Sequence, residues 1–288
     1  MCKFIESQRD NYPVKAMCEA LSLSRSTFTT WQNTSQSART DKDTEARDKI
    51  RFYFNEHRSR YGSRRLMVEL AQSAHMPMSR NRIRRLMKKE GLRAIQPKSF
   101  VPKTTDSRQS RNIAPNLLAE KQITKPNEAW AGDITYLALT NGRWAYLATW
   151  IDMFTRRVVG WHIDTHLRTE LIIKAFEKAV YRHQPPPGLI IHSDRGSQYA
   201  SNEFVSLVKK NRFLQSMSGP DNPYDNAMAE SFFGRLKTEL IQQGTFINIE
   251  DARTEIFDYI ECYYNTIRRH SAINYLSPDQ FEKSLFTN

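Results

Sequence analysis

The sequence predicts an all-α N-terminal part followed by a mixed α/β domain, and three observations support this division. Apolar residues recur at helical spacing within the first 95 residues. From Ala129 onward, short runs rich in β-branched and aromatic residues alternate with helical segments. Between these parts, residues 96–128 hold four prolines in a polar, cationic stretch without steady periodicity, which predicts a basic linker.

Residues 1–38 are predicted to form a short helix-turn-helix-like unit. Helices are expected over 14–21 and 25–31, with a polar break at Ser22–Ser24 and Ser24 as the N-cap of the second helix. Helix, tight turn and helix is the outline of a DNA-reading motif. The alternative is a helical hairpin that packs on another part of the protein.

Residues 39–95 are predicted to form a helical DNA-binding module with helices over 43–57, 64–74 and 80–90. Ser79 is the expected cap of the third helix, and Gly91 its expected end. One face of this helix is apolar and the rest is cationic, with only Glu90 opposing the positive charge. That imbalance favours DNA contacts over a merely solvated face, and the predicted DNA-binding residues are Arg80, Arg82, Arg84, Arg85 and Lys88.

Composition supports a nucleic-acid partner. The 288 residues carry a formal net charge of +12, which indicates a polyanionic ligand. No apolar run reaches the ~18 residues of a membrane span, and no secretory signal opens the chain. Three scattered cysteines supply neither a disulfide framework nor a zinc spacing, so we expect a cytoplasmic, nucleoid-associated protein without a membrane partner.

Residues 129–288 are predicted to form the α/β domain. Asn141-Gly142 is a strong two-residue hairpin signal between the first two strands. The expected elements are strands over 134–140, 143–152 and 157–163, a helix over 170–183, a strand over 188–192, a helix over 201–211, a strand over 212–217 and a helix over 227–242. This order is that of an RNase H-like domain with a mixed five-stranded sheet, here followed by a C-terminal helical tail.

Three acidic residues in this domain are the candidate catalytic and metal-binding residues. Asp133 lies in a run of strand-forming residues, where a carboxylate is disfavoured. Asp194 follows an apolar strand, at the point where open α/β sheets present ligands. Glu230 lies on the first turn of a helix. Each alone is compatible with a structural role, but together they predict a catalytic metal site.

The expected chemistry follows from charge. Carboxylates bind hard cations such as Mg²⁺, and two such ions can drive in-line attack on a phosphodiester. Asp133 could bridge both ions, with Asp194 and Glu230 each completing one side, so no histidine base is required. His192 is expected to be a structural neighbour of Asp194, and Asp152 a structural or supporting residue.

Two cations near these acids are further candidates for DNA contacts. Lys237 stands seven residues after Glu230, two turns along the same helix face, where DNA phosphate would run. Arg195 follows Asp194 directly.

Several long motifs carry a family resemblance that covers nearly the whole chain. They are Tyr61–Arg65 and Arg82–Met87 in the helical module, Asp133-Ile134-Thr135-Tyr136, His192–Tyr199 and Asn226–Phe233 in the core, and Tyr264-Asn265, Arg268–His270 and Ser277-Pro278 in the tail. In these residues the chain resembles the DDE transposases of bacterial insertion sequences. Within them it is similar to the catalytic, second-reading-frame (OrfB) type, whose core resembles retroviral integrases.

The resemblance implies that Asp133, Asp194 and Glu230 bind two Mg²⁺ ions, for which Mn²⁺ is an expected substitute, and that Lys237 contacts DNA. It also implies recognition of terminal inverted repeats, DNA strand cleavage and strand transfer. Synapsis of two DNA ends predicts a homo-oligomer on DNA. An upstream-frame (OrfA) protein, or a frameshift fusion with it, is a further expected partner.

Two other functions stay open at this stage. An RNase H-like nuclease or resolvase would hydrolyse DNA without joining it. A DNA-binding regulator of its own element would use only residues 1–95 and would need no catalytic acids.

Overall fold

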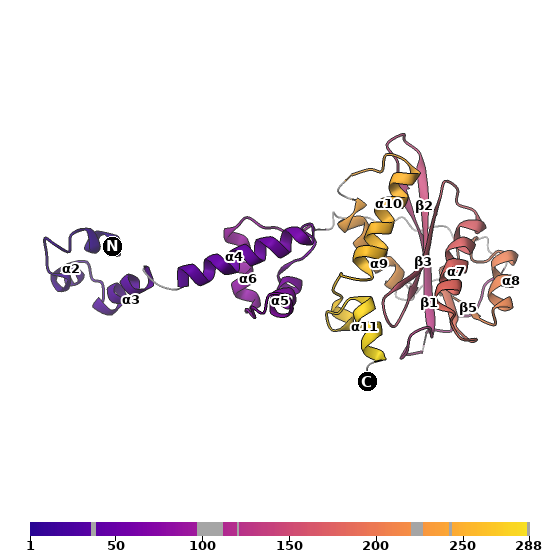
Figure 1. Cartoon of the computed structure of the whole chain (residues 1–288), viewed down its shortest axis with the longest axis horizontal. Coiled ribbons are helices and arrows are strands. Elements are labelled where there is room, and N and C mark those ends of the chain that lie inside the picture. The colour runs from indigo at the N-terminus through magenta and orange to yellow at the C-terminus, as the bar shows by residue number, and fades with distance from the viewer. Residues whose placement is uncertain (36–38, 97–111, 120, 220–226, 242–243, 287–288) are drawn as a thin grey trace. The chain divides into compact units, whose positions relative to one another are not determined.

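The structure, a computed structural model, describes residues 1–35, 39–96, 112–119, 121–219, 227–241 and 244–286 (Figure 1). The chain divides into two compact units, Met1–Ala94 and Ile95–Asn288. Within the described ranges, no helix is both long enough and apolar enough to cross a membrane.

The first unit begins with three helices, α1 (Cys2–Ser7), α2 (Val14–Ala20) and α3 (Arg25–Ser35). Ile5, Met17, Cys18 and Phe28 form a small buried cluster between them. The Ser24 hydroxyl accepts the Thr27 N–H at 3.1 Å, which confirms the predicted cap. Helices α2 and α3 match the expected segments, whereas α1 was not anticipated from the sequence.

Three further helices complete this unit: α4 (Arg39–Glu56), α5 (Ser63–Gln72) and α6 (Arg80–Lys89). Each packs against the other two. Ser79 caps α6 by accepting the Arg82 N–H at 3.3 Å, and Gly91 takes a φ of +66° just beyond the helix end, as glycine can without steric cost. The three predicted helices are therefore present, and α6 buries its apolar residues Ile83, Leu86 and Met87.

The second unit contains a five-stranded sheet of strand order β3-β2-β1-β4-β5. Its strands are β1 (Ala129–Ala138), β2 (Trp144–Asp152), β3 (Val158–Asp164), β4 (Ile190–Ser193) and β5 (Leu214–Met217). The first three pair antiparallel, and β4 pairs parallel with both β1 and β5. This mixed sheet confirms the predicted RNase H-like fold class. Strand β1 begins five residues earlier than expected because Ala129–Ala131 pair with β4.

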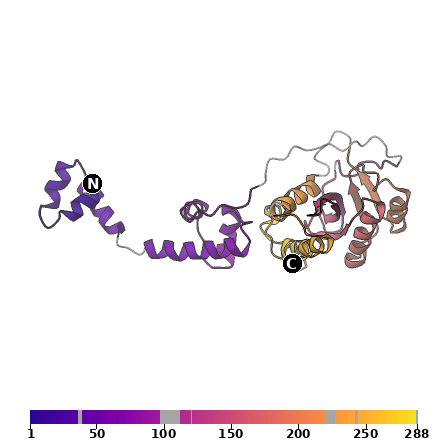
Figure 2. The same cartoon turned by 90° about the horizontal axis from the view of Figure 1, so that it is seen from above.

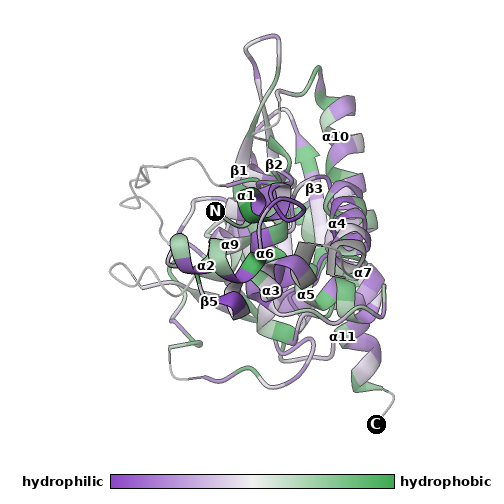
Figure 3. Cartoon of the chain, turned by 90° about the vertical axis from the view of Figure 1, so that its left-hand side faces the viewer, coloured by the Kyte–Doolittle hydropathy of each residue, from purple (hydrophilic) through white to green (hydrophobic). Residues whose placement is uncertain are grey.

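Helices cover both faces of the sheet, as Figure 1 and Figure 2 show. On one face lie α7 (Thr169–His183) and α8 (Asn202–Lys210). On the other lie α9 (Ala227–Glu239), α10 (Ile249–Phe257), a π-helix (Asp258–Tyr264) and α11 (Pro278–Leu285). Helix α10 mixes hydrophilic and hydrophobic residues along its length (Figure 3), consistent with a helix that buries only Ala252 and Ile256.

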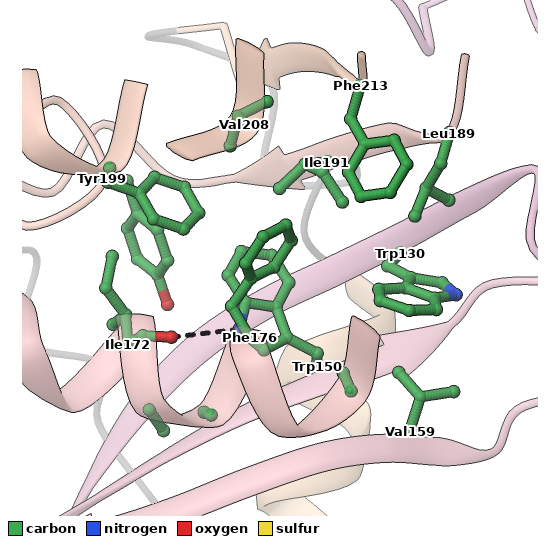
Figure 4. Packing of buried hydrophobic residues seen from close by; sticks show 14 of the residues in the cluster. Trp130, Trp150, Val159, Ile172, Phe176, Leu189, Ile191, Tyr199, Val208 and Phe213 are labelled. Atoms are coloured by element: carbon green, nitrogen blue, oxygen red, sulfur yellow. Dashed lines mark hydrogen bonds between the residues drawn. The ribbon is translucent and has the colours of Figure 1, made fainter. Parts of the chain in front are cut away.

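The main core lies between the sheet and the α7/α8 layer, around Trp150 (Figure 4). The Trp150 ring lies 5.6 Å from that of Phe176 and 5.8 Å from that of Tyr199, and its Nε1–H donates to the Ile172 carbonyl at 3.4 Å. Gly132, which pairs with Trp150 across β1 and β2, has no room for a side chain. An added Cβ would lie 2.4 Å from the indole Cζ3.

The described end of the linker lies on the second unit. The Asn112 amide donates to the Ala200 carbonyl at 2.9 Å, and the Leu117 N–H donates to the Ser216 hydroxyl at 2.9 Å. Residues 97–111 and 120 of the predicted linker lie outside the described residues.

We expect Gly132→Ala to lower the free energy of unfolding by about 1–3 kcal/mol, because the new methyl overlaps the rigid indole of Trp150. Urea denaturation measures the change. Gly234→Ala in α9 is the matched control, since its Cβ meets nothing within 4 Å and alanine favours the helix by roughly 0.5–1 kcal/mol. Equal effects of the two substitutions would contradict this packing account.

Candidate active site

Asp133 lies in the middle of β1, directly opposite Thr149 of β2. Side chains alternate along a strand, so Asp133 points away from Trp150 and toward the face that carries α9. The side chain is half-buried, and its Oδ1 accepts the N–H of Ile134 at 2.7 Å.

Asp194 follows β4 immediately, beside β1 in the sheet. Its Oδ1 accepts the Gly196 N–H at 2.9 Å, a local turn that orients the carboxylate. Buried His192 contacts the Ser216 hydroxyl through Nδ1 at 2.8 Å and the Ser218 hydroxyl through Nε2 at 3.3 Å. The histidine therefore joins β4 to the segment of β5, as expected for a structural neighbour.

Glu230 and Lys237 lie on α9, which contacts β1 and buries its apolar residues Ala229, Phe232, Phe233 and Leu236. Glu230 is exposed in the first turn, and Lys237 is half-buried. The apolar positions of α9 therefore fix the helix on the sheet and leave the two charged residues at its border.

Electrostatics shows that the sheet and α9 bring these groups into mutual range. Burial and the neighbouring charge of Asp194 raise the pKa of Asp133 to about 7, and Glu230 adds to the rise. The Ile134 N–H and the charge of Lys237 oppose it. Burial also raises the pKa of Asp194, opposed by the Gly196 N–H. The three predicted acids and the predicted lysine thus share one electrostatic environment.

The donor chemistry of this environment suits a hard divalent cation. All three acids offer carboxylate oxygens. The pKa of Asp133 is raised first by burial and then by the charge of Asp194, and a bound cation would offset that neighbouring charge. In the part of the chain that the structure describes, no three acidic, histidine or cysteine side chains are gathered closely enough to hold a metal ion. A bound cation would therefore require the carboxylates to move closer together.

The Tyr199 hydroxyl was not anticipated as part of this site. It is fully buried, and among the described residues it has no hydrogen-bond partner. Burial and the charges of Asp133 and Asp194 hold the pKa of its phenol well above the usual range. Its place five residues after Asp194 was visible in the sequence, but the effect of the Asp133 charge on its phenol depends on tertiary packing.

Asp152 has a different role. Its carboxylate accepts backbone N–H groups of Asn127 at 2.6 Å, Phe154 at 2.9 Å and Thr155 at 2.8 Å, which closes the turn after β2. Asp152 pairs with Trp130, three residues along β1 from Asp133. The structure therefore supports the structural interpretation of this residue.

A buried ion pair anchors the C-terminal end of α9. Arg268 donates from Nη2 to Glu239 Oε1 at 2.6 Å and from Nε to Oε2 at 2.8 Å, and the Tyr259 hydroxyl donates to Oε2 at 3.0 Å. All three side chains are buried. The tail that follows α10 thereby holds the helix that carries Glu230.

In the first unit, the predicted DNA-binding residues of α6 differ in their contacts within the protein. Arg82 and Arg85 both donate to Asp43 of α4, at 2.9 and 3.0 Å, and Arg80 donates to the Ser63 hydroxyl at 3.5 Å. Burial acts to raise the pKa of Asp43, but its hydrogen bonds and charge interactions with both arginines hold it below the usual value. Arg84 and Lys88 are exposed.

Arg195, the remaining predicted DNA contact, is half-buried and donates from Nε to the Ser218 carbonyl at 2.9 Å. This bond ties the turn after Asp194 to the end of β5. Contact of Arg195 with DNA stays a prediction.

A mixed β3-β2-β1-β4-β5 sheet, with acids on adjoining strands and on a later helix, defines an RNase H-like core of the integrase type. Comparison with known protein families agrees. Two families described as "Integrase core domain" match residues 123–223 and 230–286, and a family described as "HTH-like domain" matches residues 40–100.

Known proteins then give the particular family. The chain is 37% identical over 282 residues to the "Transposase InsF for insertion sequence IS3A" of Escherichia coli (strain K12), covering 97% of both chains. It is 40% identical over 237 residues to the "Transposase for insertion sequence element IS904" of Lactococcus lactis, covering 82% of this chain and 92% of the relative. The HTLV-2 integrase catalytic core domain is 19% identical, with a TM-score of 0.41, and the match covers 55% of this chain and 97% of that one. The chain belongs to the IS3-type insertion-sequence transposases.

The raised pKa of Asp133 predicts a pH-dependent stability of the metal-free protein. Stability associated with the protonated carboxyl is fully present below the ordinary pKa of 3.8 and is lost as the pH rises through about 7. We therefore expect Asp133→Asn to increase the unfolding free energy at pH 8 by about 2 kcal/mol, after allowing for partial solvation of the side chain, and to change little at low pH. Urea unfolding in chelator at both pH values measures this, with exposed Glu250→Gln as control. A pH-independent difference would contradict the account.

Removal of the buried positive charge of Arg268 should destabilise the fold. We expect Arg268→Met to lower the unfolding free energy by about 3–5 kcal/mol, because Glu239 is left buried and unneutralised. Denaturant unfolding tests this. The double variant Glu239→Gln/Arg268→Met removes the stranded charge and should recover much of the loss; no recovery would show that packing, and not charge, dominates.

Proposed function

We propose that this transposase cleaves and joins DNA strands at the terminal inverted repeats of its element, with Asp133, Asp194 and Glu230 as its catalytic, metal-binding residues. The proposal rests on the charge environment of Asp133, because the charges of Asp194, Glu230 and Lys237 all act on the pKa of this carboxyl. Three carboxylates carried by an integrase-type sheet and the helix beside it are suited to Mg²⁺, with Mn²⁺ as a substitute. When bound, two such ions activate an attacking hydroxyl and stabilise charge on the leaving oxygen.

The other tasks, orientation of the carboxylates and binding of DNA, fall to residues of the chain itself. Asp133 is held by the rigid β1–β2 pairing and Asp194 by its turn, so both carboxylates are oriented in advance. Lys237 supplies positive charge beside them, where it would attract and align a DNA phosphate. Arg195 is placed on the same turn as Asp194 and contributes a second cation. The basic helix α6 supplies further contacts to DNA.

Joining a cleaved end to a second site requires two DNA segments to be held together. We therefore propose that the protein acts as a homo-oligomer on DNA, in the cytoplasm and in contact with the nucleoid. An upstream-frame partner, or a fusion with it, would extend the recognition of the terminal repeat.

Strand transfer on a labelled duplex that carries the terminal repeat of the element tests the proposal. In Mg²⁺ we expect Asp133→Asn, Asp194→Asn and Glu230→Gln each to reduce cleavage and joining by roughly 10³-fold or more, because each removes a carboxylate from the metal site. Glu250→Gln, a change at an exposed acid of α10, should keep full activity. Binding and unfolding measured alongside separate loss of chemistry from loss of fold.

The outcomes also distinguish the other functions. Hydrolysed products without joined strands would identify a nuclease or resolvase. Sequence-dependent binding with no cleavage by folded wild-type protein would identify a regulator. Full activity in all three acidic variants would remove the proposed site.

For Lys237→Ala we expect about a tenfold loss of strand transfer and a salt dependence of DNA binding reduced by roughly one unit of slope, since one phosphate contact is removed. Lys209→Ala is the matched control, because this exposed lysine lies on α8, across the sheet from α9. An equal effect of both substitutions would mean that Lys237 contributes only net charge.

A further inference from the structure

The outward face of α6 differs from a uniformly basic surface. Its apolar residues Ile83, Leu86 and Met87 are buried, and the opposite side presents exposed Asn81, Arg84, Arg85 and Lys88. These four positions are spaced at i, i+3, i+4 and i+7, so they lie along one stripe of the helix. Helix α5 offers no such stripe, because Met67, Val68 and Ala71 are only partly covered and interrupt its polar surface.

Asp43 makes different hydrogen bonds with the two arginines of α6 that it contacts. Arg82 donates both Nε and Nη2 to Asp43 Oδ1, at 3.2 and 2.9 Å, and is 37% exposed, so it ties α6 to α4. Arg85 donates only Nη2, to Oδ2 at 3.0 Å, and is 53% exposed. Arg85 is therefore held through Nη2 alone, and the rest of its guanidinium is left for other contacts.

This arrangement favours base edges over phosphates as the partner of Arg85. A carboxylate beside the guanidinium weakens attraction to a phosphate anion, but it fixes the orientation that a neutral acceptor pair requires. Guanine presents such a pair in the major groove, and adenine presents a matching donor and acceptor to a carboxamide. Asn81 is the uncharged member of the stripe, one turn before Arg85.

We propose that α6 reads two neighbouring base pairs of duplex DNA, an adenine through Asn81 and a guanine through Arg85, and that Asp43 is the positioning residue that holds Arg85 for this reading. Arg84 and Lys88 flank this pair and contact phosphates. The inference rests on the proposed action on DNA and adds the residues that select the sequence.

The test is selection from a random-sequence duplex library by the full-length protein, followed by sequencing of the bound DNA. Wild type should enrich a motif that contains adjacent adenine and guanine positions. Asn81→Ala should flatten the preference at the adenine, and Arg85→Lys, which keeps the charge but not the fork, should flatten it at the guanine, each by about ten- to a hundredfold. Asp43→Asn should relax the same guanine position as Arg85→Lys, an effect that general destabilisation would not produce.

Lys88→Ala is the matched control, because it should weaken binding to all sequences and lower the salt slope by about one while leaving the motif unchanged. The inference is overturned if the library yields no motif, or if Arg84 or Lys88 substitutions change base preference while Asn81 and Arg85 substitutions do not. Strand transfer by the same wild-type preparation is measured separately, so loss of this inference is distinguishable from loss of the proposed catalytic function. If Asp43→Asn does not fold, the comparison of Asn81→Ala and Arg85→Lys with Lys88→Ala still decides it.

Discussion

The parallel pairing of β1 with β4 is the constraint on which the candidate active site depends. It places Ala131 beside His192, so that Asp133 and Asp194, each two residues further along, follow the paired residues of adjacent strands. The cost of this placement is seen at Asp133, whose pKa is raised first by burial and then by Asp194. A partly buried, repelling pair of acids is unfavourable for stability alone, and such sites are typical of function.

The rest of the second unit supports the β1–β4 pairing and the acids that follow it. Trp150 fills the core under β1 and leaves no room for a side chain at Gly132. His192 joins β4 to the segment of β5, and Asp152 closes the turn after β2. The Glu239–Arg268 pair fixes the far end of α9, so that Glu230 and Lys237 approach the sheet from a helix held at both its apolar face and its terminus.

The first unit uses acidic residues in another way. Asp43 and Glu90 each lie within ion-pair distance of two arginines on the facing helix, and these contacts tie α4 to α6. The acids therefore remove little of the cationic character of α6 but decide which arginines are constrained. Orientation, and not net charge, separates the side chains suited to bases from those suited to phosphates.

The sequence by itself determined the order of helices and strands from α2 to α9, because periodicity, the Asn141-Gly142 turn and the caps at Ser24 and Ser79 are local signals. It also singled out Asp133 and Asp194, since acids are unusual in and beside apolar strands, and Glu230 in the first turn of a later helix. Tertiary structure alone decided that Asp152 closes the turn after β2, that β1 extends back to Ala129, that burial and the charge of Asp133 act on the Tyr199 phenol, and that Asp43 joins α4 to α6. Those features depend on contacts between elements, for which a single sequence carries no periodic or local signal.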